Sequence, residues 1–335
     1  MKFDVGIMNN QPVPAIVRQV QLAESLGFDT AWITDSHLVC RELWVTLTAC
    51  VLGTSRIRLG PGVTVPHTRH FSVTASAIAT LHDLAGDRLV LGIGTGGSSA
   101  ETMGWSVQRA ARIATLETMA HGIRALVSTR TARFETGVEG RIAWLEAPRA
   151  VPIYVAGSGP KMLRAAGRLG DGVIMYAGKA PEILRAGLSH VADGARERGL
   201  KVADLDVVLW TPTAVGRDRA VARDHVRGRV ASAMRHPLPV DLSPEDQAAV
   251  RRLRHAYDSY QHATAASRHR ELVPDRFVDL FALAGTPEEV VAQVRRVMDV
   301  PEVRRIIILP QVPGAGFSER ETILKLFADE VMSRV

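Results

Sequence analysis

The sequence has few cysteines, few aromatic residues and no long apolar run. Its two cysteines, Cys40 and Cys50, make neither a disulfide framework nor a metal-binding spacing. No apolar run approaches the roughly 20 residues that a membrane-spanning helix requires. No basic–apolar–small signal opens the chain, because Phe3–Ile7 already has the pattern of a strand. We therefore expect a soluble cytoplasmic protein with no bound metal and no membrane partner.

The charged residues form no long run of one sign. The net charge is +6 and the basic residues are mostly arginine, but no lysine/arginine cluster resembles a nucleic-acid-binding arm. Aromatic residues that could stack on bases are not interleaved with the basic ones. We expect no nucleic-acid partner. The arginine surplus reflects either overall composition or attraction of an anionic small ligand.

Strand-like and helix-like segments alternate along the 335 residues, of which 46% are hydrophobic. Eight such alternations favour an α/β fold, the (β/α)8 TIM barrel. A doubly wound sheet is the second choice, but Met8-Asn9-Asn10 after the first strand is not its glycine fingerprint. The predicted strands are Phe3–Ile7, Thr30–Thr34, Ile57–Thr64, Leu89–Ile93, Val151–Ala156, Gly172–Tyr176, Leu205–Trp210 and Arg304–Leu309.

The connection after the seventh predicted strand is longer than a simple helical crossover requires. It is rich in arginine and extends from Gly216 to Arg276. We interpret the chain as a single barrel domain, 1–335, with an insertion at about 217–276. The determinants of substrate choice are expected in this insertion.

The stretch Val151–Arg164 joins a buried strand to a helix through glycines. Gly157 and Gly159 allow the backbone to approach a ligand closely, and Pro160 suits the first position of a helix. The free amides of the helix start, together with Ser158 and Lys161, would suit a phosphate. An ordinary strand–turn–helix junction is an equally good interpretation of this segment alone.

Polar or glycine-rich residues follow nearly every predicted strand, where a barrel carries its function. Asp35 and His37 follow the second strand, Thr64 ends the third, and Gly94–Ser99 follows the fourth. Two glycine-rich ends indicate a large flat ligand that carries a phosphate. Taken singly, Asp35 could cap a loop and His37 could be structural. No nucleophile elbow, Walker motif or pair of catalytic carboxylates is present.

Five regions of the sequence, given at the end of this paragraph in chain order, together resemble the bacterial luciferase-like superfamily. Within it they most resemble the deazaflavin (F420)-dependent reductases, typified by methylene-tetrahydromethanopterin reductase. The resemblance covers nearly the whole chain except about 217–276. The stretches are TAWITDSHL and LWVTLTA (30–49), RIRLGPGVTVPHTRH (56–70), RLVLGIGTGGSSAETMG (88–104), VPIYVAGSGPKMLRAAG (151–167) with DGVI (171–174), and FALAGTPEEV (281–290).

This resemblance implies a TIM barrel that holds coenzyme F420, or alternatively FMN, over its mouth. It implies a non-prolyl cis peptide bond at Gly62–Val63, and a homodimer. It also assigns a polar pair, Asp35 and His37, to the reactive edge of the ring as catalytic residues, with His37 giving a proton and Asp35 holding it protonated. The implied cofactor-binding residues are Gly62, Val63 and Thr64, then Gly94, Thr95, Gly96, Gly97 and Ser98, and for the phosphate Gly157, Ser158, Gly159, Pro160 and Lys161.

The reaction implied by the resemblance is hydride transfer from C5 of reduced F420 to a C=N or C=C bond of a small organic substrate. A reduced-FMN-dependent monooxygenase on the same barrel is the first alternative, and a cofactor-binding non-catalytic subunit is the second. The sequence departs from the tetrahydromethanopterin enzymes at two points. Gly6–Asn10 contains no carboxylate, and Ser36 separates Asp35 from His37.

Overall fold

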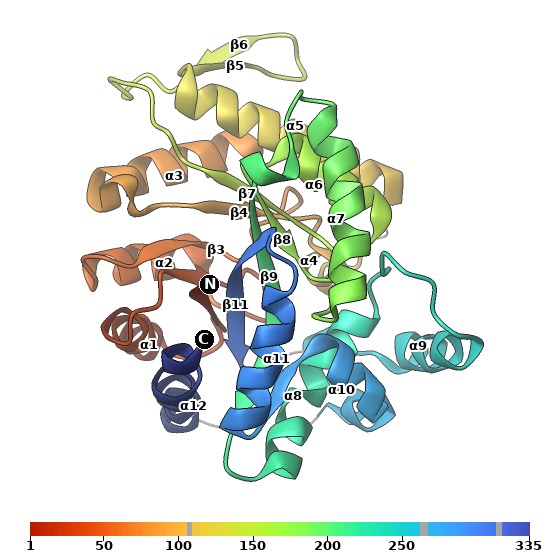
Figure 1. The fold of residues 1–335 in the computed structure, drawn as a ribbon. Coiled ribbons are helices and arrows are strands. Elements are labelled where there is room, and N and C mark those ends of the chain that lie inside the picture. The colour runs from red at the N-terminus through yellow and green to blue at the C-terminus, as the bar shows by residue number, and fades with distance from the viewer. Residues whose placement is uncertain (106–108, 262–266, 313–316) are drawn as a thin grey trace.

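Eight parallel strands form a barrel at the centre of this computed structural model (Figure 1), which describes residues 1–105, 109–261, 267–312 and 317–335. Their spatial order is β3-β2-β1-β11-β9-β8-β7-β4, and single bridges, Leu59 to Leu89 and Thr64 to Ile93, connect the two end strands. The predicted (β/α)8 barrel is confirmed. Its strands are β1 (Lys2–Ile7), β2 (Thr30–Ile33), β3 (Arg58–Pro61), β4 (Leu91–Ile93), β7 (Ile153–Gly157), β8 (Gly172–Met175), β9 (Asp206–Val215) and β11 (Val303–Pro310).

The helices surround the barrel and follow its strands in the chain (Figure 1). In the described residues they are α1 (Val13–Ser25), α2 (Leu43–Leu52), α3 (Phe71–Ala85), α4 (Gly97–Thr102), α5 (Arg109–Ser128), α6 (Pro160–Leu169), α7 (Pro181–Arg196), α8 (Arg219–Met234), α9 (Pro244–Ala256), α10 (Asp275–Phe281), α11 (Pro287–Met298) and α12 (Phe317–Glu330). The sequence also predicts a helix near Val107–Val127, whose first two residues lie outside the described ones.

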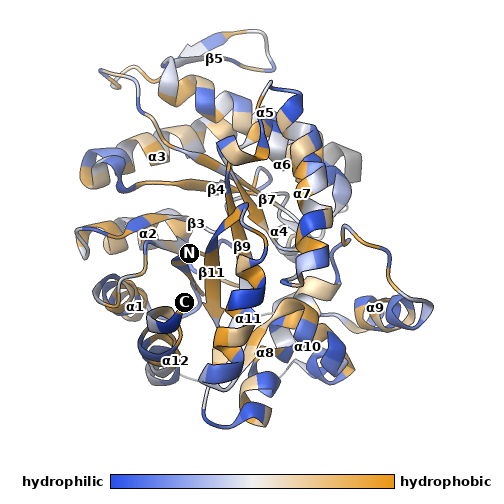
Figure 2. Cartoon of the chain, in the orientation of Figure 1, coloured by the Kyte–Doolittle hydropathy of each residue, from blue (hydrophilic) through white to orange (hydrophobic). Residues whose placement is uncertain are grey.

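The central strands are mostly hydrophobic along their length, as Figure 2 shows. Their buried side chains fall into two clusters, because one face of the sheet packs on helices and the other fills the barrel. Trp32, Tyr154 and Trp210 belong to the inner cluster, and Trp32 meets Tyr154 edge to face at 5.2 Å. Large side chains therefore fill the interior below the mouth, and a ligand can enter only from the strand ends.

The connection between β9 and β11 contains α8, α9, α10, α11 and a short strand, β10 (Leu283–Gly285), which pairs with β9. The predicted insertion after the seventh strand is thus present. Its first helix, α8, packs against β9 and β10, whereas α9 lies at the edge of the molecule (Figure 1). The insertion is therefore partly built into the wall of the barrel.

Sequence analysis predicted neither the helices α8, α9 and α10 of the insertion nor several short elements, namely strand β10, helix α4 and a hairpin of β5 (Thr131–Arg133) with β6 (Glu139–Arg141). The hairpin strands are three residues long and mostly polar, so they carry no hydrophobic alternation. Several predicted strand ends also differ by a few residues. The seventh strand continues to Val215, well past the predicted end at Trp210.

A buried cluster of charges closes the N-terminal end of the barrel. Arg305 donates to Asp206 at 2.8 Å and Asp4 at 3.2 Å, and it also contacts Asp29. The indole N–H of Trp32 donates to Asp4 at 3.0 Å. Burial raises the pKa of Asp4 to about 6, although the charge of Arg305 and the hydrogen bond from Trp32 act in the opposite direction.

This cluster makes stability depend on pH. The pKa of Asp4 is higher in the folded protein than its ordinary value of 3.8, so folding favours the protonated acid. Its contribution is present in full below about pH 4 and declines until about pH 6. The unfolding free energy of wild type relative to Asp4→Asn should fall by about 3 kcal/mol across this window, because each tenfold change in an acid dissociation constant corresponds to about 1.4 kcal/mol. Urea unfolding at pH 4, 5, 6 and 7 measures it.

The exposed carboxyl of Asp299 provides the control for this measurement. Asp299→Asn removes one charge without touching the cluster. A difference between wild type and Asp4→Asn that stays constant from pH 4 to pH 7 would contradict the assignment.

Candidate functional site

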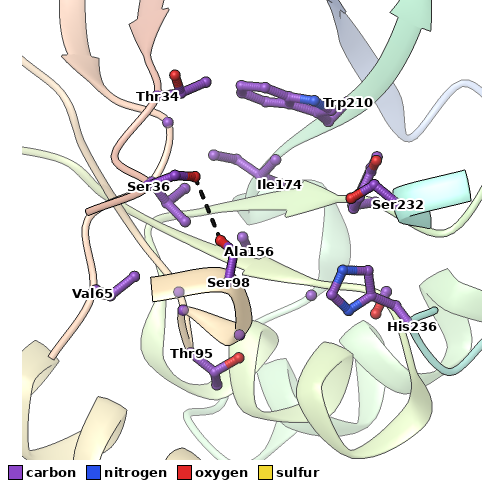
Figure 3. Close-up of a pocket in the computed structure, with 18 of the residues that line it drawn as sticks. Thr34, Ser36, Val65, Thr95, Ser98, Ala156, Ile174, Trp210, Ser232 and His236 are labelled. Atoms are coloured by element: carbon purple, nitrogen blue, oxygen red, sulfur yellow. Dashed lines mark hydrogen bonds between the residues drawn. The ribbon is translucent and has the colours of Figure 1, made fainter. Parts of the chain in front are cut away.

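A cavity of about 220 Å³ opens at the C-terminal ends of the barrel strands. The residues that line it follow or end β2, β3, β4, β7, β8, β9 and β11, and a further group comes from α8 and the turn after it. In Figure 3, Ser36 and Val65 lie on one side of this space, and Ser232 and His236 lie on the other. The cavity is thus formed jointly by the barrel and the insertion.

One wall of the cavity is made by the end of β3 and the loop after β4. Its lining includes most of the residues expected to hold the ring of a cofactor, namely Gly62, Val63, Gly94, Thr95, Gly96, Gly97 and Ser98. The peptide bond between Gly62 and Val63 is cis, as expected.

Glycine is needed in this wall because the chain is closely packed. A Cβ atom on Gly62 would lie 2.8 Å from Cβ of Trp32, and one on Gly94 would lie 2.7 Å from a methyl group of Val63. A Cβ atom on Gly97 would meet no protein atom within 4 Å, since this residue borders the cavity. The wall is therefore tight behind Gly62 and Gly94 and open in front of Gly97.

The glycine turn after β7 reaches the cavity only in part. Gly157 and Ser158 line it, whereas Gly159 and Pro160 lie behind them at the start of α6 and Lys161 is exposed. A Cβ atom on Gly159 would lie 2.7 Å from Cβ of Pro237. Glycine is thus required at 159 because the backbone there packs closely against Pro237 of the insertion.

Asp35 lines the cavity, but its carboxylate is engaged by the protein. It accepts hydrogen bonds from the Thr64 hydroxyl at 2.8 Å and from Arg69 at 3.2 Å. Arg69 also contacts Glu42. Burial raises the pKa of Asp35, and the charge of Arg69 opposes that shift. Thr64 does not line the cavity, and its hydroxyl donates to the Asp35 carboxylate from outside the lining.

The side chain of His37 is exposed and is not part of the cavity lining. Its backbone N–H donates to Ser99 at 3.3 Å, and its carbonyl accepts from Thr102 at 3.1 Å. These two bonds tie the loop after β2 to α4. The structure therefore does not bring His37 together with Asp35 at the cavity, contrary to the arrangement expected from the sequence.

Sequence analysis did not single out the residues that face this wall from the insertion. They are Arg229 and Ser232 on α8, followed by Arg235 and His236 just after it. The intervals of three and four residues between 229, 232 and 236 place them along one helical face. The sequence carried no signal for them, because the burial of Arg229, which is 7% exposed, appears only in the folded protein.

Protein contacts fix the positions of these polar groups. Arg235 forms an ion pair with Glu101 at 2.7 Å, and its guanidinium lies 3.9 Å from the centre of the Tyr257 ring. The Tyr176 hydroxyl donates to the Arg229 carbonyl at 3.3 Å. The upper part of the cavity therefore carries two arginines, Arg229 and Arg235, close to apolar side chains.

The composition of the lining suits a planar, phosphate-bearing, anionic cofactor. Apolar side chains such as Ile174, Trp210 and Leu309 line its inner part. Among the described lining residues Asp35 is the one carboxylate, and Arg69 balances its charge. No group of three or more metal-binding side chains occurs in the part of the chain that the structure describes. No helix within the described ranges is long and apolar enough to cross a membrane.

A parallel α/β barrel with a glycine-lined cavity at the C-terminal ends of its strands has the architecture of a barrel enzyme with its site at the mouth. The chain belongs to the luciferase-like monooxygenase family, whose model matches residues 1–300.

The chain is similar over its full length to proteins that use F420. It is 30% identical to 5,10-methylenetetrahydromethanopterin reductase of Archaeoglobus fulgidus, with 100% of both chains covered. It is 29% identical to F420-dependent glucose-6-phosphate dehydrogenase of Beutenbergia cavernae, with 94% of this chain and 91% of the relative covered. The solved coenzyme F420-dependent tetrahydromethanopterin reductase of Methanopyrus kandleri has a TM-score of 0.79 at 24% identity, with 99% and 98% covered.

Proposed function

We propose that this protein is an F420-dependent oxidoreductase that transfers a hydride between the deazaflavin and a small organic substrate. One observation carries the proposal. The cavity has the glycine wall and cationic rim that this cofactor needs, in a chain that matches F420-dependent relatives end to end. When bound, the deazaflavin supplies or accepts a hydride at C5.

The residues of the chain bind and orient the two reactants. The backbone of Gly62–Val63 and the loop Gly94–Ser98 would hold the ring, and Ile174 and Trp210 would exclude water from it, since all of them line the cavity. Ser158 and the amino end of α6 hold the phosphate, because free amides and the helix dipole favour an anion there. Positioning the two reactants at contact distance provides most of the catalytic effect.

The proposal is tested by adding cofactors anaerobically and following their visible absorbance and fluorescence. We expect tight binding of F420 and weaker binding of FMN. Oxidised F420 should then be reduced by a donor, or reduced F420 should be oxidised by acceptors with C=N, C=C or C=O bonds. Oxygen consumption with reduced FMN would identify the monooxygenase alternative. Binding without turnover of any donor or acceptor would identify the non-catalytic subunit.

The phosphate site provides a separate prediction. Ser158→Ala should weaken F420 binding by about 10-fold or more, because a hydrogen bond to a charged group contributes about 1.5–3 kcal/mol. Fluorescence titration measures the dissociation constant. Ser189→Ala, on the exposed side of α7, is the matched control. Unchanged affinity for F420 in Ser158→Ala would show that the phosphate does not bind at this turn. Substitution of Gly159 is less informative, because it would also displace Pro237.

We also propose that the protein is a homodimer, and that helices α2 and α3 form its interface. Neither α2 nor the first eleven residues of α3, Phe71–Leu81, contain a charged residue. Their outer faces expose Val45 (64%), Leu52 (69%) and Val73 (55%) beside small residues such as Ala77. The two helices are in contact, so these exposed apolar side chains lie on neighbouring helices.

The substitutions Val45→Glu and Leu52→Glu together should convert the dimer to a monomer, because each would leave a charge in an apolar interface. Light scattering during gel filtration measures the mass. Val138→Glu, an exposed apolar residue elsewhere (62%), controls for added charge. A monomeric wild type, or a dimer that survives both substitutions, would contradict the interface.

A further inference from the structure

The described lining of the cavity contains five side chains that can carry a charge, and four of them have fixed roles. The Asp35 carboxylate is paired with Arg69, and the Tyr176 hydroxyl donates to a backbone carbonyl. Burial raises the pKa of Tyr176 to about 12. Arg229 and Arg235 offer hydrogen-bond donors only, because a guanidinium has no acceptor. His236 is the remaining one.

The imidazole of His236 lines the cavity and forms no hydrogen bond with the described part of the protein. Its ring nitrogens are not among the buried atoms that lack a partner, so both are accessible. The ring of Tyr176 meets it edge to face, with centroids 5.8 Å apart, and limits its rotation. Figure 3 shows the imidazole on the cavity side of the turn after α8. The ring nitrogens are therefore accessible to a ligand in the cavity.

The surroundings keep this imidazole uncharged at neutral pH. Burial, and then the positive charge of Arg235, lower the pKa of His236 to about 4, while Glu101 acts in the opposite direction. Arg254 and Arg112 add to the positive field. A neutral imidazole has one ring nitrogen free to accept a hydrogen bond or a proton. At neutral pH the ring is thus available to accept the hydrogen bond of a substrate hydroxyl, and its surroundings favour release of any proton that it takes up.

We propose that His236 is the base that takes the proton of the substrate, and that the reduced substrate carries a hydroxyl group on its reacting carbon. This inference rests on the proposed function and replaces the expected C=N or C=C acceptor by a carbonyl. In the oxidation direction the C–H bond breaks and its hydride passes to oxidised F420. The O–H bond breaks, its proton passes to a ring nitrogen of His236, and a C=O double bond forms. The proton then leaves the imidazolium for water.

The first test compares two variants with wild type in steady-state oxidation. His236→Phe keeps the ring and removes both nitrogens, and His236→Gln keeps a hydrogen-bond acceptor but no usable base. The donors are 2-propanol, cyclohexanol and glucose 6-phosphate with oxidised F420, and the acceptors are cyclohexanone, cyclohexenone and 1-pyrroline with reduced F420. The matched control is His121→Gln, an exposed histidine on α5.

We expect wild type to oxidise at least one of the alcohols and His236→Phe to lower that kcat by about 100- to 10,000-fold, the usual range for acid–base catalysis. His236→Gln should also be slow, whereas His121→Gln should match wild type. Cofactor affinity should not change. Wild type that reduces only the alkene or the imine, or a His236→Phe variant within a few-fold of wild type, overturns the inference and leaves the proposed function intact.

The second test needs neither cofactor nor turnover. In protein labelled with ¹⁵N-histidine, the imidazole signal lost in His236→Phe belongs to His236. Its nitrogen shifts should report a neutral ring from pH 8 down to about pH 5. An imidazolium at pH 7 overturns the role as base. Failure of F420 itself to bind in a parallel fluorescence titration would instead refute the proposed function.

Discussion

Gly97→Leu should weaken F420 binding by about 100-fold and leave the fold unchanged. Gly97 lines the cavity, and a Cβ atom there meets no protein atom within 4 Å, so the barrel can accept the new side chain. Gly97 is the first residue of α4, a position that leucine tolerates. The leucine would occupy space proposed for the cofactor. An overlap of this kind costs about 3 kcal/mol, or about 100-fold in affinity.

Fluorescence titration measures the affinity, and thermal unfolding of the cofactor-free protein tests the fold. Gly216→Leu is the matched control, because Gly216 has nothing nearer to its Cβ position than Ala222 at 4.0 Å and lies outside the cavity. If Gly97→Leu bound F420 as wild type does, the proposed place of the cofactor would be wrong. Equal loss in both variants would point to a general effect of the added side chain.

Asp35→Ala should lower the unfolding free energy by about 3 kcal/mol at pH 7. Asp35 is 8% exposed, and its partner Arg69 would lose the carboxylate that balances it inside the protein. Removing one member of a buried pair costs about 3–5 kcal/mol, and the lower figure applies because Arg69 keeps its contact with Glu42. Urea unfolding measures the change.

A double-mutant cycle separates the structural role of Asp35 from a catalytic one. The double variant Asp35→Leu with Arg69→Met should recover most of the lost stability, because no unpaired charge remains. Asp193→Ala breaks the exposed pair with Arg196 and should change stability by less than about 1 kcal/mol. An Asp35→Ala variant as stable as wild type but inactive would restore the catalytic role expected from the sequence.

The sequence by itself determined the barrel and the glycine wall. Strands that are buried on both faces are continuous apolar runs, and such runs separated by amphipathic helices allow few topologies. Gly62 and Gly94 stand in stretches that resemble the family, although the atoms that leave no room for a side chain there belong to distant residues, Trp32 and Val63. Because of this resemblance the residues expected to support the ring were found without the structure.

The tertiary structure decided which polar groups face the cavity. Asp35 and His37 are two residues apart, but one points inward to Arg69 and the other lies on the surface. The sequence placed both at a strand end and could not tell their directions, because the loop after β2 has no regular period. The space next to Gly159 is likewise occupied by Pro237, which is 78 positions later in the chain.

His236 is the clearest case of a residue that only the tertiary structure could assign. It lies in the insertion, where the resemblance to the family is weakest, and no motif surrounds it. Its place opposite the glycine wall depends on how α8 packs against β9 and β10. Short-range patterns specify helices and strands because those depend on neighbouring residues. The contents of a cavity depend on contacts between distant segments, which form only when the whole connection folds back over the barrel.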